Sequence, residues 1–226
     1  MKNSLSSSSE ATVSRVLLTG VEPFGRNYMN SAWGACRLVA ESPPEDMQLE
    51  VVLLPCAFGD SIAELRKKIL RVEPELVIST GQGGSRPDVT IERVAINLKD
   101  AEGADNNGNQ PIDEPIVADG PAAYFSSIPV KACTEALLKA GIPTSVSHTA
   151  GTFLCNHIAF GLGRLIATEF SDRRGTARRT TSATAGRASA KDSIACHGMP
   201  PADKIPHPAS TEPPSANGQG LMNDRG

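Results

Sequence analysis

The chain has 226 residues and a mass of 23.7 kDa, enough for one domain with a substantial apolar core. Its net charge of -3 and pI near 5.8 argue against a nucleic-acid-binding protein, because no excess of positive charge is present to neutralise phosphates. No apolar run reaches transmembrane length, and the serine-rich N-terminus lacks the apolar segment of a signal peptide. We therefore expect a cytoplasmic protein with no membrane contact and no nucleic-acid partner.

The cysteines indicate a reducing compartment. Their number is odd, they are widely spaced, and no C-x-x-C pair occurs among them. Neither a disulfide framework nor a zinc site fits this spacing, so we expect reduced thiols and no bound metal. The five cysteines are Cys36, Cys56, Cys133, Cys155 and Cys196.

The first half of the chain alternates between short β-prone runs and helical patterns. The β-prone runs cover residues 15–20, 49–54 and 76–80, and the helical patterns cover residues 32–40, with Ser31 as N-cap, and 62–72. Strands that alternate with helices in this way predict an α/β fold with a largely parallel sheet. The active site of such a sheet lies at the carboxyl ends of its strands.

The second half of the chain is less regular. Glu92 and Arg93 are neighbours in a strand-like run and have the form of a plain surface ion pair. The glycine run at residues 81–84 does not match a phosphate-binding loop, because no Gly-Lys-Ser/Thr follows it. We expect a strand or ribbon at residues 90–97, a turn-rich loop at 105–110, an exposed flap at 120–128 and a helix at 131–140.

The stretch from Ser145 to Gly161 contains the best nucleophile candidate. A β-prone run ends at Gly151, and a helical pattern begins close to Cys155. Unpaired backbone N–H groups and the helix dipole favour an anion at such a position, so we predict a thiolate near neutral pH. The alternative is a buried structural cysteine. His157 points away from Cys155 along the helix and is interpreted as a packing or capping residue.

Three blocks of sequence resemble one known family. They are L-L-T-G-V-E-P-F-G, with Asn30 and Trp33 after it; G-Q-G-G-S-R-P-D-V-T-I-E-R-V-A-I-N, which continues to D-N-N-G-N-Q-P-I-D; and T-A-G-T-F-L-C-N-H. In this order they resemble pyroglutamyl peptidase type I, or pyrrolidone-carboxylate peptidase. The members are cytosolic cysteine peptidases that remove an N-terminal pyroglutamyl residue. The resemblance extends over about residues 16–166.

The resemblance implies a fold, a substrate and a set of site residues. The fold is a three-layer α/β/α single domain with a twisted, mostly parallel sheet of the phosphorylase/hydrolase-like kind. The nucleophile falls on Cys155 and the triad carboxylate on Glu92, while the ring-binding elements fall on Phe24, Asn30 and Gln82. The substrates are peptides with N-terminal pyroglutamate, the chain is a homo-oligomer as in the family, and neither a cofactor nor a metal is implied.

The resemblance stops soon after Phe170. Members of the family continue with a strand of the form G-F-I-H-x-P-Y that supplies the catalytic histidine, whereas this chain continues with Arg, Thr, Ser and Ala. A change of reading frame after Phe170 is one hypothesis for this switch. We predict a disordered lead at residues 1–13, a C-terminally incomplete catalytic domain at 14–170, and a low-complexity, disordered tail at 171–226, which has too little apolar surface to fold.

The catalytic histidine is therefore not assigned by the resemblance. His197, in C-H-G-M-P-P, is the first choice, while His148 is interpreted as structural and His207 lies in a Pro-rich segment. Three functions compete: a working cysteine omega peptidase, an inactive member that retains at most pyroglutamyl or amide binding, and a thiol redox protein. The last ranks lowest because Cys155 has no resolving cysteine near it in sequence.

Overall fold

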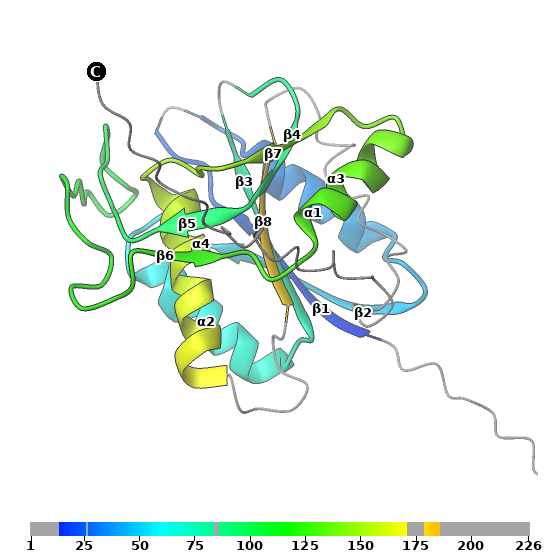
Figure 1. Ribbon diagram of the computed structural model, residues 1–226, viewed down its shortest axis with the longest axis horizontal. Coiled ribbons are helices and arrows are strands. Elements are labelled where there is room, and N and C mark those ends of the chain that lie inside the picture. The colour runs from blue at the N-terminus through cyan, green and yellow to red at the C-terminus, as the bar shows by residue number, and fades with distance from the viewer. Residues whose placement is uncertain (1–13, 26, 84–85, 171–178, 186–226) are drawn as a thin grey trace, which may run out of the picture.

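The structure is a computed structural model that describes residues 14–25, 27–83, 86–170 and 179–185. A six-stranded sheet lies between two pairs of helices, in the strand order β2-β1-β3-β8-β4-β7 (Figure 1). The strands are β1 (Ser14–Val21), β2 (Met47–Leu54), β3 (Leu76–Gln82), β4 (Val89–Glu92), β7 (Thr144–Ser147) and β8 (Arg179–Ala185). Four of the five strand pairs are parallel, so the predicted α/β class with a mostly parallel sheet is confirmed.

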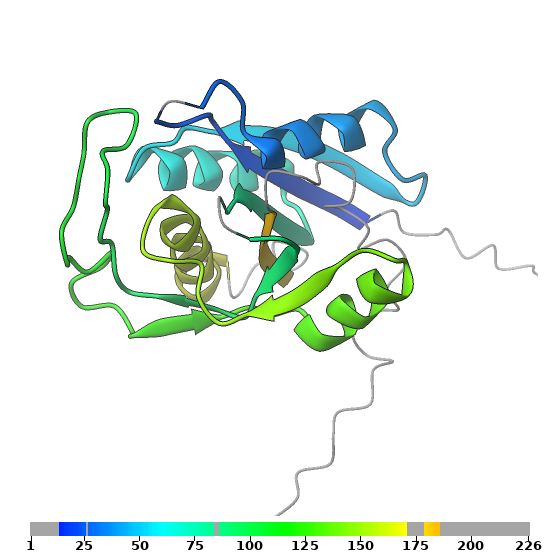
Figure 2. The same cartoon turned by 90° about the horizontal axis from the view of Figure 1, so that it is seen from above.

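The helices cover both faces of the sheet. They are α1 (Ser31–Glu41), α2 (Asp60–Val72), α3 (Val130–Lys139) and α4 (Leu154–Leu165), and a π-helical turn, η1 (Ile166–Phe170), continues α4. Helices α2 and α4 lie on one face, and α1 and α3 lie on the other (Figure 2). Within the described part of the chain, no helix combines the length and the apolar character needed to cross a membrane.

The main apolar core lies between the sheet and helices α2 and α4. Leu17, Val77, Leu65 and Ile69 are fully buried there, together with the apolar face of α4. The first two belong to the apolar runs that predicted strands, and the other two lie four residues apart on the inward face of α2. The sequence pattern therefore predicted this half of the fold correctly.

The chain reverses direction after β3. Only residues 83–88 join β3 to β4, and such a link is too short for the crossover that a parallel neighbour requires. Strand β4 therefore runs antiparallel to β8, and β7 pairs in parallel with β4. Cys155 follows the reversed strand β7, yet its thiol lies beside Gly81 at the carboxyl end of β3, where the sequence predicts the active site.

Residues 90–97 form parts of two strands instead of one. Strand β4 ends at Glu92, and the chain then enters β5 (Val94–Ile96), which pairs with β6 (Ala123–Phe125) in a separate two-stranded ribbon. The predicted flap at residues 120–128 thus contains a paired strand. At the junction the backbone N–H of Arg93 donates to the carbonyl of Ser147 at 2.8 Å, which ties the exit of β4 to the end of β7.

Residues 179–185 form strand β8, although the sequence predicts a disordered tail there. The strand lies between β3 and β4 and provides both with backbone partners, in register from Leu76↔Arg179 to Gln82↔Ala185 on one side. Threonine is β-branched and suits a pleated backbone, which offsets the shortage of apolar residues. The predictions for residues 1–13 and for the rest of 171–226, which includes His197 and His207, fall outside the described residues.

Candidate active site

Cys155 is the second residue of α4, as the sequence predicted. The side chain of the N-cap residue Phe153 makes no capping hydrogen bond, so it does not occupy the N–H groups of the first turn. A Cβ atom added at Gly81 would lie 2.5 Å from the Cys155 Sγ. The half-buried thiol therefore lies directly against the end of β3, at a position where only glycine leaves it room.

The ionisation of this thiol differs from the sequence-based prediction. Burial raises the pKa of Cys155 to about 11, the charge of Glu92 raises it as well, and Arg86 acts in the opposite direction. The predicted acidic thiol is thus wrong, because desolvation of the thiolate and the charge of Glu92 outweigh the effect of Arg86 on its pKa. At neutral pH the thiol is therefore mostly protonated. A nucleophile in this state requires a proton acceptor in the reaction.

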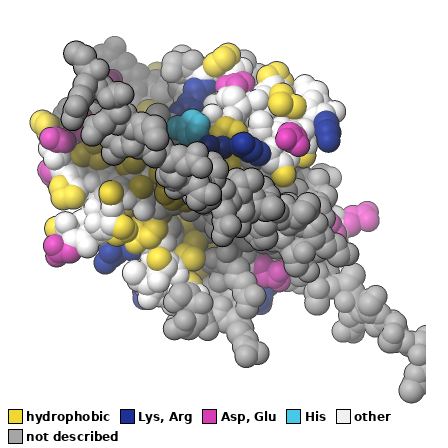
Figure 3. Space-filling view, viewed as in Figure 1, with side chains coloured by type: hydrophobic (Ala, Val, Ile, Leu, Met, Phe, Trp, Pro, Cys, Tyr) yellow, Lys and Arg dark blue, Asp and Glu magenta, His cyan; other side chains and the backbone are white. Residues whose placement is uncertain are grey.

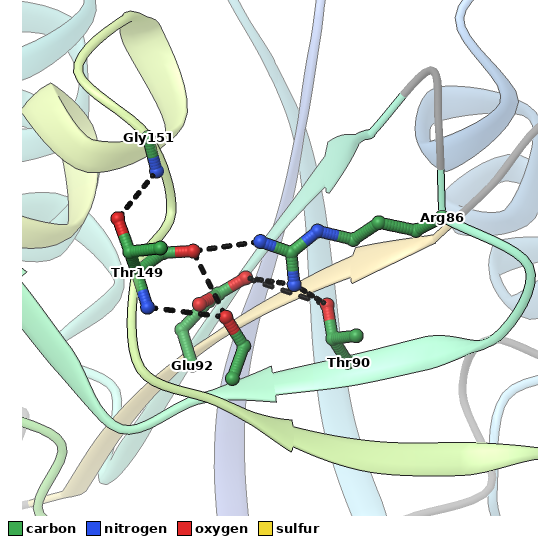
Figure 4. A network of polar contacts seen from close by, with 6 residues as sticks. Arg86, Thr90, Glu92, Thr149 and Gly151 are labelled. Carbon is green, nitrogen blue, oxygen red and sulfur yellow. Dashed lines mark hydrogen bonds and ion pairs between the residues drawn. The ribbon is translucent and has the colours of Figure 1, made fainter.

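Glu92 lies at the end of β4 and is 2% exposed. Its Oε1 lies 3.2 Å from Nη1 of Arg86 and accepts a hydrogen bond from the Thr90 hydroxyl at 3.4 Å (Figure 4). The predicted surface pair with Arg93 is wrong, since Glu92 is buried and forms an ion pair with Arg86. The carboxylate is close enough to act electrostatically on the Cys155 thiol. The two predicted catalytic residues are therefore brought together.

Two other phenylalanine rings pack against Phe153, the N-cap residue of the helix that carries Cys155. The ring centroids of Phe24 and Phe153 are 5.8 Å apart, and those of Phe58 and Phe153 are 5.4 Å apart in an edge-to-face arrangement. Only Phe24 was predicted for the site. Phe153 belongs to the block T-A-G-T-F-L-C-N-H, two residues before Cys155, so the sequence contained a signal for it. The rings form one apolar wall whose faces are tilted to each other, by 52° for Phe24 and Phe153 and by 85° for Phe58 and Phe153.

Asn30 and Gln82 are linked through the start of α1. Asn30 is the N-cap of α1, and its Oδ1 accepts from the N–H groups of Ala32 and Trp33 at 3.0 and 3.4 Å. The predicted cap at Ser31 is wrong. Ser31 instead donates from its backbone N–H, at 2.8 Å, and from its hydroxyl, at 3.3 Å, to Oε1 of Gln82. Direct contact of Asn30 and Gln82 with a substrate ring stays a prediction.

The two histidines in the described residues differ in environment. His157 is 7% exposed, its Nε2 accepts from the Gly59 N–H at 3.3 Å, and burial followed by the charge of Lys99 lowers its pKa to about 4. The interpretation of His157 as a packing and capping residue is confirmed. His148 is exposed and comes directly after β7. Of these two, His157 is fixed as a neutral acceptor and does not serve as the base.

Two buried side chains hold the site together and were not predicted from the sequence. Asp105 accepts from the Phe58 N–H at 2.7 Å, so the loop D-N-N-G-N positions one ring of the aromatic wall. Burial raises the pKa of Asp105, but hydrogen bonds from Asn109, Phe58 and Asn107 outweigh it and leave the pKa lowered. Asn156 is 1% exposed, and its amide exchanges two 2.9 Å hydrogen bonds with the backbone of Ile96, which fixes the first turn of α4 against β5.

The chain matches one family and several relatives within it. The family model for pyroglutamyl peptidase matches residues 14–177. Over 163 residues the chain is 56% identical to the pyrrolidone-carboxylate peptidase of Streptomyces coelicolor, and the match covers 72% of this chain and 76% of that protein. Pyrrolidone-carboxylate peptidase 2 of Photorhabdus laumondii is 48% identical over 164 residues, covering 73% of this chain and 75% of its own length.

Solved structures show the same likeness. Pyroglutamyl peptidase I of Bacillus amyloliquefaciens superposes with a TM-score of 0.72 at 38% identity, over 76% of this chain and 82% of that one. A mutant pyrrolidone carboxyl peptidase of the hyperthermophile Pyrococcus furiosus superposes with a TM-score of 0.71 at 32% identity, over 76% of this chain and 80% of that one. The likeness therefore includes the sequence and the three-dimensional arrangement.

Proposed function

The chain belongs to the pyroglutamyl peptidase family, and from this membership we propose that it is a cysteine peptidase that removes N-terminal pyroglutamyl residues from peptides. The observation that carries the proposal is the placement of Cys155. Its thiol lies at the head of α4, against Gly81 and within electrostatic reach of the buried Glu92. A nucleophile at a helix start beside a carboxylate suits acyl transfer.

The reaction proceeds through a thiol ester. The Cys155 sulfur loses its proton to a base and attacks the carbonyl carbon that joins the pyroglutamyl ring to the next residue. The C–N bond then breaks, the base returns the proton to the departing amine, and an acyl-enzyme remains. Water attacks the acyl-enzyme, releases pyroglutamate and restores the thiol. The high pKa of Cys155 makes proton removal an essential part of the first step.

The base is a histidine other than His157. That residue is buried and neutral, and its Nε2 is engaged by Gly59. We keep His197 as the first choice, although it falls outside the described residues, and His148 as the exposed alternative at the end of β7. Glu92 orients the base and stabilises its charged form.

The lactam ring binds against the aromatic wall. Phe24 supplies a flat apolar surface, and Phe153 and Phe58 extend it. Gln82 binds the ring through its amide NH₂, because its Oε1 already accepts from Ser31. Asn30 acts from the cap of α1 and sets the position of the loop that carries Phe24.

A fluorogenic pyroglutamyl amide tests the proposal. We expect turnover in the wild type and none in Cys155→Ala, whereas Cys133→Ala, which changes a buried thiol on α3, retains it. His197→Ala and His148→Ala identify the base by which of them loses turnover. Saturable binding of pyroglutamate without turnover in the wild type would support the inactive member instead.

We also propose the family's assembly and location for this chain. Phe125 and Ile112 are each 73% exposed, and apolar side chains gather over the ribbon and α4 in Figure 3, which suits a contact between copies. The four described cysteines are free thiols, in keeping with a cytoplasmic location. Residues 14–170 form the catalytic domain, and β8 completes its sheet. Light scattering on the wild type and on Phe125→Ser tests the homo-oligomer.

A further inference from the structure

Arg86 joins two segments of the site that are far apart in the sequence. Its Nη1 donates to the Thr90 hydroxyl at 2.6 Å and lies 3.2 Å from Oε1 of Glu92. Its Nη2 donates to the backbone carbonyl of Thr149 at 2.6 Å. Figure 4 shows the guanidinium between β4 and the turn that follows β7. One side chain thus fixes the distance between the Glu92 carboxylate and the segment that leads to Cys155.

The turn that accepts this bond is itself ordered by side chains. The Ser147 hydroxyl donates to the Thr149 carbonyl at 2.9 Å, and the Gly151 N–H donates to the Thr149 hydroxyl at 3.1 Å. Gly151 has a φ of 77°, which only glycine adopts without strain. Beyond it, Thr152 is bonded to the backbone of Asp100. The turn before the nucleophile is therefore fixed on one side by Arg86 and on the other by Asp100.

A buried carboxylate needs a partner of this kind. Glu92 is 2% exposed, so its negative charge needs a positive partner. The guanidinium of Arg86 supplies that charge, and its remaining N–H groups can donate to other acceptors at the same time. The Arg86 side chain is 25% exposed, so the ion pair is partly shielded from water. A lysine at this position carries the charge but presents a single ammonium group, which does not span acceptors on two segments.

We propose that Arg86 is a positioning residue for the reaction of Cys155, holding Glu92 and the Thr149 turn in one fixed arrangement beside the thiol. The inference rests on the proposed function only in taking Cys155 as the nucleophile. Arg86 belongs to the block G-Q-G-G-S-R-P-D-V-T-I-E-R-V-A-I-N, but its contact with Thr149 joins residues 63 positions apart and could not be read from the sequence.

The electrostatics of the thiol agree with this role. The pKa of Cys155 is raised by burial and by Glu92 and is lowered by Arg86. Cys56 also interacts electrostatically with this thiol. Removal of the guanidinium takes away a favourable cation and leaves the charge of Glu92 less balanced. Both changes raise the pKa of Cys155 and reduce its thiolate fraction.

The experiment measures the alkylation of Cys155 by iodoacetamide between pH 6 and 11, read by mass spectrometry of the Cys155 peptide, in the wild type, Arg86→Gln and Arg86→Lys. In Arg86→Gln we expect the profile to move to higher pH, with alkylation at pH 8 about three- to tenfold slower, because the thiolate fraction falls about tenfold when the pKa rises by one. In Arg86→Lys we expect a smaller change, with a fall in kcat for a pyroglutamyl amide and little change in KM. Arg66→Gln, which breaks an exposed ion pair with Glu169, is the matched control. We expect it to leave the alkylation profile and kcat unchanged.

The outcomes separate this inference from the proposed function. If Arg86→Gln is folded and shows the same pH profile of Cys155 alkylation as the wild type, the positioning role is overturned. This holds whether or not the chain has peptidase activity. If Arg86→Gln does not fold, Arg86→Lys decides: unchanged kcat and an unchanged profile overturn the inference. Wild-type protein that is alkylated normally but turns over no substrate overturns the proposed function alone.

Discussion

Strands β3 and β8 are neighbours in the middle of the sheet but differ in composition. Strand β3 has the sequence L-V-I-S-T-G-Q, with Val77 fully buried, and it carries the glycine that lies against the nucleophile. Strand β8 has the sequence R-T-T-S-A-T-A, with alanine as its only apolar residue type. The two strands are paired along all seven residues of β8.

The difference shows that a strand can hold a central position for different reasons. A strand covered by helices on both faces normally has a near-continuous apolar sequence, as β3 does. Strand β8 lacks such a sequence and has backbone partners in β3 and β4. We infer that β3 supplies apolar burial and one wall of the site, whereas β8 supplies mainly the register between β3 and β4.

The largest expected effect comes from Gly81→Ala in β3. The new Cβ would meet the Cys155 Sγ at 2.5 Å, so the nucleophile must move. We expect turnover of a pyroglutamyl amide to fall at least about a hundredfold, as for a catalytic group misplaced by about 1 Å. Gly34→Ala in α1 is the control, because a Cβ there meets nothing within 4 Å. Near-normal turnover in Gly81→Ala would show that β3 does not determine the position of the thiol.

Acid unfolding tests whether stability resides on the side of the sheet that contains α2 and α4. The folded-state pKa of His157 is about 4, so the unfolded chain binds a proton on this residue as the pH falls from about 6.5, while the folded chain does not. The stability contribution is therefore present at neutral pH and is lost as the pH falls toward 4. We expect a loss of about 2 to 3 kcal/mol over this range.

Urea unfolding at pH 7 and pH 4 measures this loss. His157→Gln, which keeps an acceptor for the Gly59 N–H but does not titrate there, should show a smaller difference between the two pH values. The exposed His148→Gln should behave as the wild type. An equal pH dependence in the wild type and His157→Gln would place the acid sensitivity elsewhere, including the region of β8.

A histidine introduced into β8 tests the idea that this strand supplies register. Position 182 pairs with Ser79 and Glu92, and position 184 pairs with Gly81 and Thr90, so both lie in line with the nucleophile and the carboxylate. A base introduced at either position would share its cross-strand register with β3 and β4, which carry Gly81 and Glu92. We expect Ser182→His or Thr184→His to raise turnover about tenfold, a modest share of what a well-placed general base provides.

Ala183→His is the matched control for this prediction. Position 183 pairs with Thr80 and Ile91, and successive residues of a strand point to opposite faces. If Ala183→His raised turnover as much as Ser182→His or Thr184→His, the effect would not depend on the strand register, and the prediction would fail. No gain at any of the three positions would contradict the prediction.

The sequence predicted the elements that are specified locally. Strands β1 to β3 and helix α2 follow from apolar runs and helical spacing, and the start of α4 follows from the break at Gly151. The reversal of β4 was also predictable, since residues 83–88 are too few for a crossover. Strand β8 was not, because its place depends on pairing with β3, about one hundred residues earlier.

The site divides in the same way. Cys155 and Glu92 were identified by resemblance, and the structure brings them together. The pKa of Cys155 was mispredicted, because the sequence reveals the helix terminus but not the extent of burial. Asn30 is the cap of α1, a role that was predicted for Ser31 and that depends on which residue starts the helix, while its contact with the ring stays a prediction. Arg86 was missed, because its partners come from the end of β7 as well as from β4.

The smallest expected effect comes from substitutions that make β8 more apolar and β3 less apolar, which tests the comparison between these two strands. Ala183 is half-buried in β8, and Ala183→Val adds a β-branched apolar side chain to a central strand. We expect a gain of about 0.5 kcal/mol in the free energy of unfolding, measured by urea titration. The reverse exchange in β3, Val77→Ala, removes two fully buried methyl groups and should cost about 2 kcal/mol. If Ala183→Val destabilised the protein as much as Val77→Ala, β8 would be packed as tightly as β3, and the distinction between burial and register would fail.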